Sequence, residues 1–211
     1  MSLEVFLERN KHIITTMILG YLTEQTQNNQ NYEVVWKEYQ TQVCDKFIEY
    51  LKENGYTNIS VTVKKSTYPE FTVVEGKDKY AFDVKVSVDT QNPSYDIARL
   101  DTFSTRLNEY KNEYEVIVKY NINSGVAAVY FESLYNVIGI HRNTKGMVKF
   151  RPYDGKVRPK TWEDFDNNKS YFNSKSELIQ GIKKAKIFRN KQLAESWKNE
   201  FTNEEYQLII G

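Results

Sequence analysis

The sequence predicts an α/β fold of the α+β kind, in which a mixed central β-sheet is flanked by helices. Two long segments with apolar residues at helical spacing come first, short strand-like segments fill the middle, and helical segments return at the end. This order lacks the regular alternation of strand and helix that an all-parallel sheet requires. With 211 residues, of which 40% are hydrophobic and 27% are charged, the chain is long enough for one substantial core. We therefore expect a single domain over residues 1–211.

Two amphipathic helices are expected at the N-terminal end. From Leu3 to about Thr26, apolar residues recur three and four positions apart, and the same spacing extends from Tyr32 to Asn54. The pair Asn54-Gly55 is a typical C-terminal stop for the second helix.

Strands dominate the middle of the chain. Alternating apolar residues predict a strand over Ile59 to Lys64, and the runs Glu70 to Val74 and Tyr80 to Val88 predict an antiparallel hairpin. The later elements are expected in this order: a helix over about Asp96–Lys111, strands over Tyr114–Asn121, Val126–Phe131 and Tyr135–Ile140, a helix after Ser174, and a helical stretch from Leu193. Glu177, three residues after Ser174, gives a capping-box pattern at the start of that helix.

Composition excludes several kinds of site. The single Cys44 rules out an internal disulfide and a cysteine zinc site. The two histidines, His12 and His141, are far apart in sequence, so a histidine metal site is not expected. No apolar run approaches the roughly 18 residues of a transmembrane helix, and the N-terminus lacks the features of a signal peptide. We therefore expect a cytoplasmic protein with no membrane partner.

The formal net charge of +1 conceals a basic segment. Residues 141–191 contain 14 Lys and Arg against 5 Asp and Glu, whereas the rest of the chain contains 15 against 23. A basic segment on a nearly neutral protein is a candidate surface for a polyanion such as nucleic acid. A solvated, lysine-rich surface is the alternative.

The segment Ser66 to Val88 carries the strongest chemical signal. Asp83 and Lys85 lie two apart within an apolar strand, so both side chains point to the same face. Glu70, from the preceding strand, can join them across the hairpin. Two carboxylates suit Mg²⁺, and a lysine can hold or deprotonate an attacking water. An exposed hairpin with a plain salt bridge between Asp83 and Lys85 explains the same spacing.

The residues Tyr68 to Val73 (YPEFTV), followed by Ala81 to Lys85 (AFDVK), resemble the signature of the PD-(D/E)XK nuclease superfamily. Among its members, the pattern is most similar to type II restriction endonucleases of the EcoRV kind, which have a Tyr-Pro-acid-Phe-Thr strand followed by Ile-Asp-Ile-Lys. The first acid is usually Asp, whereas here it is Glu70, whose side chain is longer by one methylene. The resemblance implies a restriction-endonuclease-like fold.

The same resemblance implies the roles of the site residues. Glu70 and Asp83 would bind Mg²⁺, and Lys85 would act on the water that hydrolyses a phosphodiester bond. The helix before the hairpin is expected to supply a further glutamate, for which Glu38 is the nearest candidate, although Gln40 lies closer to the expected position. The implied substrate is double-stranded DNA, cut at a palindromic sequence by a homodimer. The first two helices are candidates for the dimer surface.

Three groups of residues are expected to contact DNA. They are Lys65, Ser66 and Thr67 before the hairpin; Arg142, Asn143, Thr144 and Lys145 in a turn; and Lys183, Lys184, Lys186 and Arg189 near the C-terminal end. In the resemblance, the first group lies near the minor groove, and the turn takes the place of a recognition loop with groups that read base edges. A plain hairpin turn and a solvated basic face are the alternatives.

Two other functions remain open. One is a PD-(D/E)XK nuclease that recognises a DNA structure or acts in repair, because the superfamily also includes enzymes of repair, recombination and tRNA processing. The other is a non-catalytic DNA-binding module, in which Asp83 and Lys85 form only a salt bridge. Cleavage of DNA into discrete fragments distinguishes a restriction endonuclease from a structure-specific or repair nuclease. DNA binding that does not depend on Mg²⁺, without cleavage, indicates the non-catalytic module.

Overall fold

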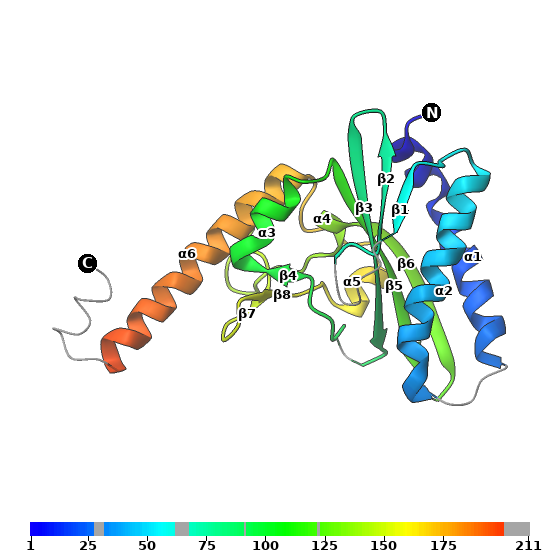
Figure 1. Cartoon of the computed structure of the whole chain (residues 1–211). Helices are drawn as coiled ribbons and strands as arrows, with labels where there is room; N and C mark the ends of the chain where they lie inside the picture. Colours follow the sequence, from blue (N-terminus) through cyan, green and yellow to red (C-terminus); the bar gives the residue numbers. More distant parts are fainter. Residues whose placement is uncertain (28–31, 62–67, 91, 122, 201–211) are drawn as a thin grey trace.

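The structure is a computed structural model that describes residues 1–27, 32–61, 68–90, 92–121 and 123–200 (Figure 1). Its helices are α1 (Leu3–Gln27), α2 (Tyr32–Glu53), α3 (Leu100–Leu107), α4 (Leu134–Val137), α5 (Trp162–Asp166) and α6 (Lys175–Glu200). Its strands are β1 (Ile59–Val61), β2 (Phe71–Glu75), β3 (Asp78–Val88), β4 (Ala98–Arg99), β5 (Asn112–Asn121), β6 (Gly125–Ser133), β7 (Phe150–Arg151) and β8 (Lys156–Val157).

The centre of the molecule is a five-stranded sheet with the strand order β1-β2-β3-β5-β6. Strands β1, β2 and β3 form an antiparallel meander, β5 runs parallel to β3, and β6 returns antiparallel to β5. The parallel pair requires a crossover connection, which α3 and its flanking segments provide. A separate three-stranded sheet, with the order β4-β8-β7, consists of strands of two residues each.

Helices α1 and α2 cover one face of the large sheet (Figure 1). An aromatic stack runs across the strands on this face: Phe71–Phe82, Phe82–Tyr114 and Tyr114–Phe131, with ring centroids 4.7, 5.5 and 5.4 Å apart. Phe47 of α2 packs edge-on against three of these rings. Because side chains alternate along a strand, the polar residues between these aromatics point to the opposite face.

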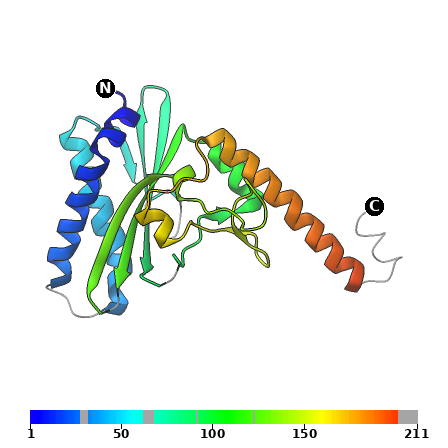
Figure 2. The ribbon, with the colours of Figure 1, turned by 180° about the vertical axis from the view of Figure 1, so that it is seen from behind.

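The opposite face is covered by α3, α4, α5, the N-terminal half of α6 and the small sheet (Figure 2). A second hydrophobic core lies here, and it includes Leu100, Phe103, Ile117, Trp162, Phe165 and Ile182. The C-terminal half of α6 extends away from the body of the molecule in both ribbon views. The predicted class, a mixed sheet flanked by helices, is confirmed.

The predicted helix over Asp96–Lys111 is shorter in the structure, because α3 begins only at Leu100. Ala98 and Arg99 pair with β8 instead, and Arg99 has the extended conformation φ −84°, ψ 138°. A tertiary partner thus replaces the first turn that the apolar spacing predicted, since helix propensity is a weak local preference.

The predicted strand over Tyr135–Ile140 is wrong. Residues Leu134–Val137 form the short helix α4, and Ile138 and Ile140 make only isolated bridges with Pro159 and Val148. A short apolar run does not by itself distinguish a strand from a buried helical turn.

The start of α6 follows the prediction. Ser174 Oγ accepts a hydrogen bond from the Glu177 backbone N–H at 3.2 Å, as a helix cap does. The helix then continues to Glu200, so the helical stretch expected from Leu193 is part of the same helix. Within the ranges that the structure describes, no helix combines the length and apolar character needed to cross a membrane.

Candidate active site

The register between β3 and β5 gathers acidic side chains on one face of the sheet. Asp83 is the direct partner of Glu115, and Ala81 is the partner of Glu113. Because side chains alternate along each strand, Asp83, Lys85, Glu113 and Glu115 all point to the face opposite α1 and α2. The three acids are almost completely buried, with exposed fractions of 2%, 2% and 1% for Asp83, Glu113 and Glu115.

Glu70 reaches this group from the residue before β2. Extending the hairpin register by one residue places Glu70 opposite Asp83. Its Oε2 accepts a hydrogen bond of 3.2 Å from the backbone N–H of Val84, which holds the carboxylate against β3. The structure therefore brings together the three residues predicted from the hairpin, namely Glu70, Asp83 and Lys85.

Asp83 and Lys85 form an ion pair, with Oδ2 and Nζ 2.5 Å apart. The contact is an ion pair rather than an aligned hydrogen bond, since no described residue offers Asp83 Oδ2 a donor in hydrogen-bonding geometry. Burial lowers the pKa of Lys85, but the negative charges of Asp83 and Glu115 outweigh burial and raise this pKa above its ordinary value. The charged ammonium is therefore favoured, and it can donate hydrogen bonds to a water or to an anionic oxygen.

Glu115 is buried without a hydrogen-bond partner. Neither of its carboxylate oxygens accepts a hydrogen bond from any residue in the described ranges. Burial raises the pKa of Glu115 to about 8, and the neighbouring charge of Asp83 acts in the same direction, while Lys85 opposes it. The site thus contains a carboxyl group whose negative charge the surrounding side chains compensate only partly.

Glu113 has a different environment, although it lies on the same face of β5. Arg106 of α3 donates from Nε to Glu113 Oε2 over 3.0 Å, and the Tyr68 hydroxyl donates to the same oxygen. The guanidinium of Arg106 also lies 3.5 Å from the centre of the Tyr68 ring. Glu113 therefore links both α3, through Arg106, and the segment before β2, through Tyr68, to strand β5 beside the site.

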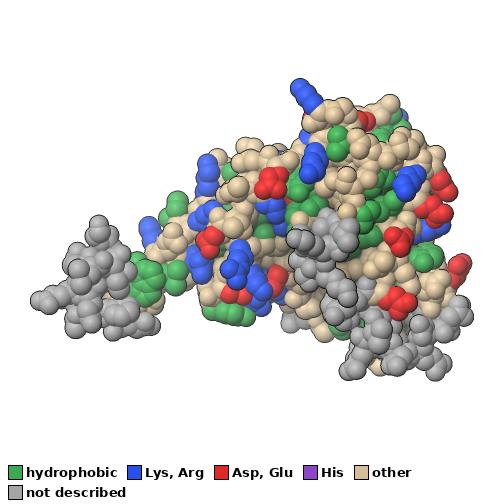
Figure 3. All heavy atoms as spheres, viewed as in Figure 1, with side chains coloured by type: hydrophobic (Ala, Val, Ile, Leu, Met, Phe, Trp, Pro, Cys, Tyr) green, Lys and Arg blue, Asp and Glu red, His purple; other side chains and the backbone are tan. Residues whose placement is uncertain are grey.

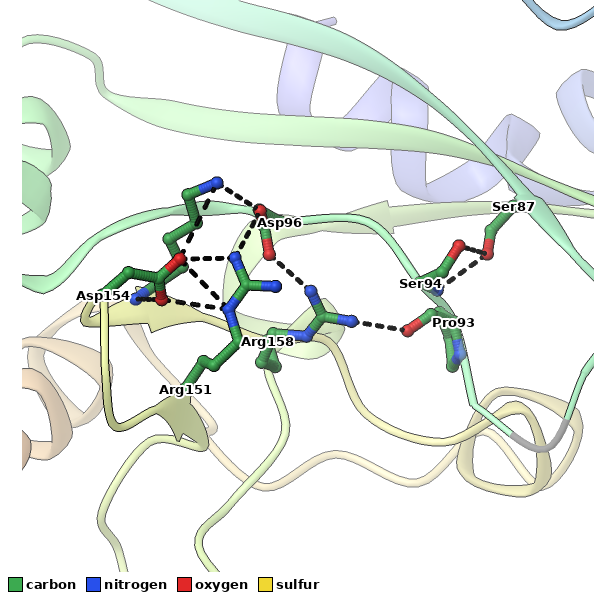
Figure 4. A network of polar contacts seen from close by, with 8 residues as sticks. Ser87, Pro93, Ser94, Asp96, Arg151, Asp154 and Arg158 are labelled. Carbon is green, nitrogen blue, oxygen red and sulfur yellow. Dashed lines mark hydrogen bonds and ion pairs between the residues drawn. The ribbon is translucent and has the colours of Figure 1, made fainter.

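The segment 93–96 joins β3 to the small sheet (Figure 4). The backbone N–H of Ser94 donates to Ser87 Oγ at 2.8 Å, and Ser87 lies on the same face of β3 as Asp83. Tyr95 follows at once, and burial raises its pKa well above the ordinary value, with the charges of Glu115 and Asp83 adding to the effect. The Tyr95 phenol thus lies against Glu115 and Asp83, with its hydroxyl beside the Glu115 carboxylate but not in good hydrogen-bonding geometry.

Asp96 anchors the other end of this segment (Figure 4). Its carboxylate pairs with Lys156 Nζ at 2.8 Å, with Arg151 Nη2 at 3.3 Å and with the guanidinium of Arg158. Burial raises the pKa of Asp96, but the hydrogen bonds from Lys156 and Arg158 outweigh burial and lower it overall. Three cations of the basic segment are thus occupied in holding the small sheet onto the site face.

The acids of the site fit a divalent cation that is bound jointly with water and substrate. Among the described residues, no three His, Cys, Asp or Glu side chains form a group that could hold a metal ion alone. A Mg²⁺ site does not require three protein ligands, because one or two carboxylates usually hold the ion together with waters and phosphate oxygens. The unpartnered oxygens of Glu115, beside Asp83, are hard ligands of this kind.

The structure does not bring Glu38 to this group. Its side chain is exposed on α2, and its Oε1 accepts a hydrogen bond of 3.3 Å from Gln42 Nε2. Gln40 points to β3 instead, where its Nε2 donates to the backbone oxygen of Val84 at 2.9 Å. Residues two apart on a helix lie on different sides of it. This helix therefore supports β3 with an amide and supplies no carboxylate from position 38.

Part of the expected DNA-contacting set is exposed. Arg142, Asn143 and Lys145 project from the turn 141–147, which packs beside α6, and Lys184 Nζ lies 3.5 Å from the backbone oxygen of Lys145. Lys183 and Lys184 are also exposed on α6. Within the described part of the chain, none of these four cations is engaged in an ion pair.

The other cations of this set have intramolecular partners. Lys186 Nζ donates to the backbone oxygen of Asp101 at 3.0 Å and contacts Ser104, while Arg189 donates to the backbone oxygen of Pro152 at 3.3 Å. These two side chains hold α6 against α3 and the small sheet.

In Figure 3, Lys and Arg side chains gather over α6 and the small sheet, whereas Asp and Glu side chains are prominent over α2. Lys65, Ser66 and Thr67 lie outside the described residues.

Three charged residues near the site were not identified from the sequence, namely Glu113, Glu115 and Arg106. The alternation Glu113-Tyr114-Glu115 indicated a strand with two acids on one face, but only the register with β3 reveals their position beside Asp83. Arg106 carried no sequence signal, because its partner Glu113 belongs to a different element.

No protein-family model matches the sequence, and no curated protein matches it either. Among solved structures, the chain is similar to the NlaIV restriction endonuclease, with a TM-score of 0.50 and 16% sequence identity. The match covers 75% of this chain and 66% of the NlaIV chain, just under two thirds of that protein. This likeness shows a restriction-endonuclease-like fold, and it does not extend to the EcoRV kind in particular.

Proposed function

We propose that this chain is a Mg²⁺-dependent type II restriction endonuclease of the EcoRV-like PD-(D/E)XK kind. It would cut double-stranded DNA at a palindromic sequence and act as a homodimer in the cytoplasm. The observation that carries the proposal is the convergence of Glu70, Asp83 and Lys85 on one face of a mixed sheet, in a fold similar to that of a restriction endonuclease. That fold alone supports a nuclease, and the three side chains support the chemistry.

The carboxylates of Glu70 and Asp83 would hold Mg²⁺ at the site. When bound, the ion would lower the pKa of a coordinated water and offset negative charge on the scissile phosphate. Lys85 stays charged beside Asp83, so its ammonium group would orient the attacking water or stabilise a phosphate oxygen by donating a hydrogen bond. The water oxygen would attack phosphorus in line with the oxygen that leaves.

The exposed cations favour a DNA surface around the turn 141–147. Arg142 and Lys145 in this turn, with Lys183 and Lys184 on the adjacent helix, would neutralise phosphates. Asn143 and Thr144 carry the donors and acceptors that can read base edges in the major groove. Lys65, Ser66 and Thr67 are proposed to contact the minor groove, by resemblance to the EcoRV kind.

The test is incubation of the purified chain with plasmid and phage DNA, with and without Mg²⁺, followed by gel electrophoresis and sequencing of the ends. Discrete fragments with a common palindrome at their ends, formed only with Mg²⁺, are expected. Unspecific digestion, or cutting confined to branched or single-stranded DNA, would favour a structure-specific or repair nuclease. DNA binding without any cleavage would favour a non-catalytic module.

A further inference from the structure

Three buried glutamates lie on the same face of adjacent strands, and two of them are paired with a cation. Glu113 accepts hydrogen bonds from Arg106 and Tyr68. Glu132, the partner of Glu115 on β6, is paired with Lys11, whose Nζ lies 2.6 Å from Oε1. Glu115 has no ion pair among the described residues. The buried Tyr95 hydroxyl lies beside its carboxylate, but neither Glu115 oxygen accepts a hydrogen bond of good geometry from it or from another described residue.

This difference requires a physical explanation. Glu115 is 1% exposed, so bulk water does not solvate its carboxylate. A buried, ionised carboxylate without a partner is strongly unfavourable, and such groups in folded proteins are normally paired or bind a metal. The position of Glu115 beside Asp83, on the neighbouring parallel strand, points its carboxylate toward the residues already assigned to the site.

The local charge also calls for a cation. Glu70, Asp83 and Glu115 contribute three negative charges when ionised, and Lys85 contributes one positive charge, which leaves a formal charge of −2. The positive charge of Arg106 also acts on Glu115, but the negative charge of its partner Glu113 matches it, so the formal charge stays at −2 when this pair is included. A divalent cation with oxygen preference would balance the group.

We propose that Glu115 is an acidic ligand of the cation site, acting with Asp83 across the parallel strands β3 and β5, and that it supplies the further carboxylate expected from Glu38. This inference rests on the proposed nuclease function, since it assigns a further residue to the same site. It differs from the sequence prediction in the source of the further carboxylate: a strand of the central sheet supplies it, and α2 does not.

The experiment measures metal binding by the full chain without DNA. Isothermal titration calorimetry with MnCl₂ and MgCl₂ is combined with thermal unfolding in the presence and absence of each metal. Glu115→Gln is expected to weaken Mn²⁺ binding at least tenfold and to lose most of the metal-induced rise in Tm. Without metal, the same variant is expected to unfold no lower than the wild type, because it replaces a buried carboxyl that makes no ion pair with an amide of nearly the same shape.

Glu132→Gln is the matched control, since it changes the same group at an adjacent buried position whose carboxylate is already paired. Its metal affinity is expected to stay within twofold of the wild type. Glu115→Asp, which keeps the charge and withdraws the carboxylate by one methylene, should also weaken binding while the fold is retained.

Unchanged Mn²⁺ affinity in Glu115→Gln would overturn the inference, while metal binding by the wild type would leave the proposed function standing. If the wild type binds neither metal without DNA, the titration is repeated with CaCl₂ and a DNA duplex present, since phosphate oxygens then complete the site. Unchanged affinity of Glu115→Gln under these conditions would also overturn the inference. Absence of both binding and cleavage in the wild type would instead remove the proposed function itself.

Discussion

Arg106 Nε lies 3.0 Å from Glu113 Oε2, and this contact joins α3 to the buried start of β5 beside the candidate site. Glu113 is 2% exposed, so removal of the guanidinium would leave its carboxylate without its charged partner. Arg106→Ala is therefore expected to lower the free energy of unfolding by about 3–5 kcal/mol, the usual cost of breaking a buried pair from one side. Urea unfolding followed by circular dichroism measures this loss.

The control replaces both partners at once. Arg106→Met combined with Glu113→Leu removes the pair without leaving a buried charge, and this double variant should recover most of the stability lost in Arg106→Ala. If the double variant is as unstable as Arg106→Ala, packing of the Arg106 side chain on the Tyr68 ring, rather than the ion pair, accounts for the effect.

Asp83→Ala and Lys85→Ala should each lower the rate of Mg²⁺-dependent DNA cleavage by at least about 10²-fold, while the fold is retained. The reason is that each variant removes a charged group placed where charge develops in the reaction, an effect of about 10²–10³ in related cases. Initial rates of plasmid cleavage measure the change.

Lys119→Ala is the matched control: Lys119 lies on the same face of the sheet, but its Nζ pairs with Asp89 at 3.3 Å. Wild-type cleavage by purified Lys85→Ala would contradict the assigned role.

The sequence was sufficient to predict the hairpin part of the site. Alternation along a strand fixes the common face of Asp83 and Lys85, and a hairpin turn of a few residues fixes the position of Glu70 opposite them. The position of Glu115 beside Asp83 could not be predicted in the same way. It depends on the register of two parallel strands, which is set by the long connection through α3 and not by a local turn.

The roles of the basic residues show the same limit. Lys186 and Arg189 were expected on a DNA surface, yet their donors reach backbone oxygens of Asp101 and Pro152, far away in the sequence. The count of positive charges predicted a basic segment, but it carries no information on which cations find partners inside the fold. The choice between Glu38 and Gln40 depends on a tertiary contact in the same way, since the rotation of α2 about its axis places Gln40 against β3 and leaves Glu38 exposed.

Asp96→Asn should reduce stability in a pH-dependent way. The folded-state pKa of Asp96 is lowered by Lys156 and Arg158, so the ionised form stabilises the folded state. This contribution is present above the unfolded-state pKa of about 3.9 and is lost as the pH falls through the lowered folded-state pKa. At neutral pH the variant is expected to be about 1 kcal/mol less stable, since the ion pairs are partly exposed.

Urea unfolding at a series of pH values measures this difference. The gap between the wild type and Asp96→Asn should be constant near neutrality and should close in acid, below the unfolded-state value. Asp45→Asn, on the exposed surface of α2, is the control and should show a much smaller gap. A gap for Asp96→Asn that stays the same at acidic pH would show that shape, and not charge, accounts for its role.

Asn143→Ala and Lys184→Ala should affect DNA binding in different ways, although both residues belong to the surface formed by the turn 141–147 and α6. Lys184 is exposed and has no ion pair among the described residues, so its loss should weaken binding to all sequences alike and reduce the salt slope, d log K/d log[salt], by about 1. Asn143 carries an amide suited to base edges, so its loss should weaken the free energy of binding by about 1–3 kcal/mol at the preferred sequence and little at other sequences.

Fluorescence anisotropy with specific and unspecific duplexes, at several salt concentrations, separates the two effects. A uniform loss from Asn143→Ala, with an altered salt slope, would assign the turn to phosphate contact and leave base reading to another part of the chain.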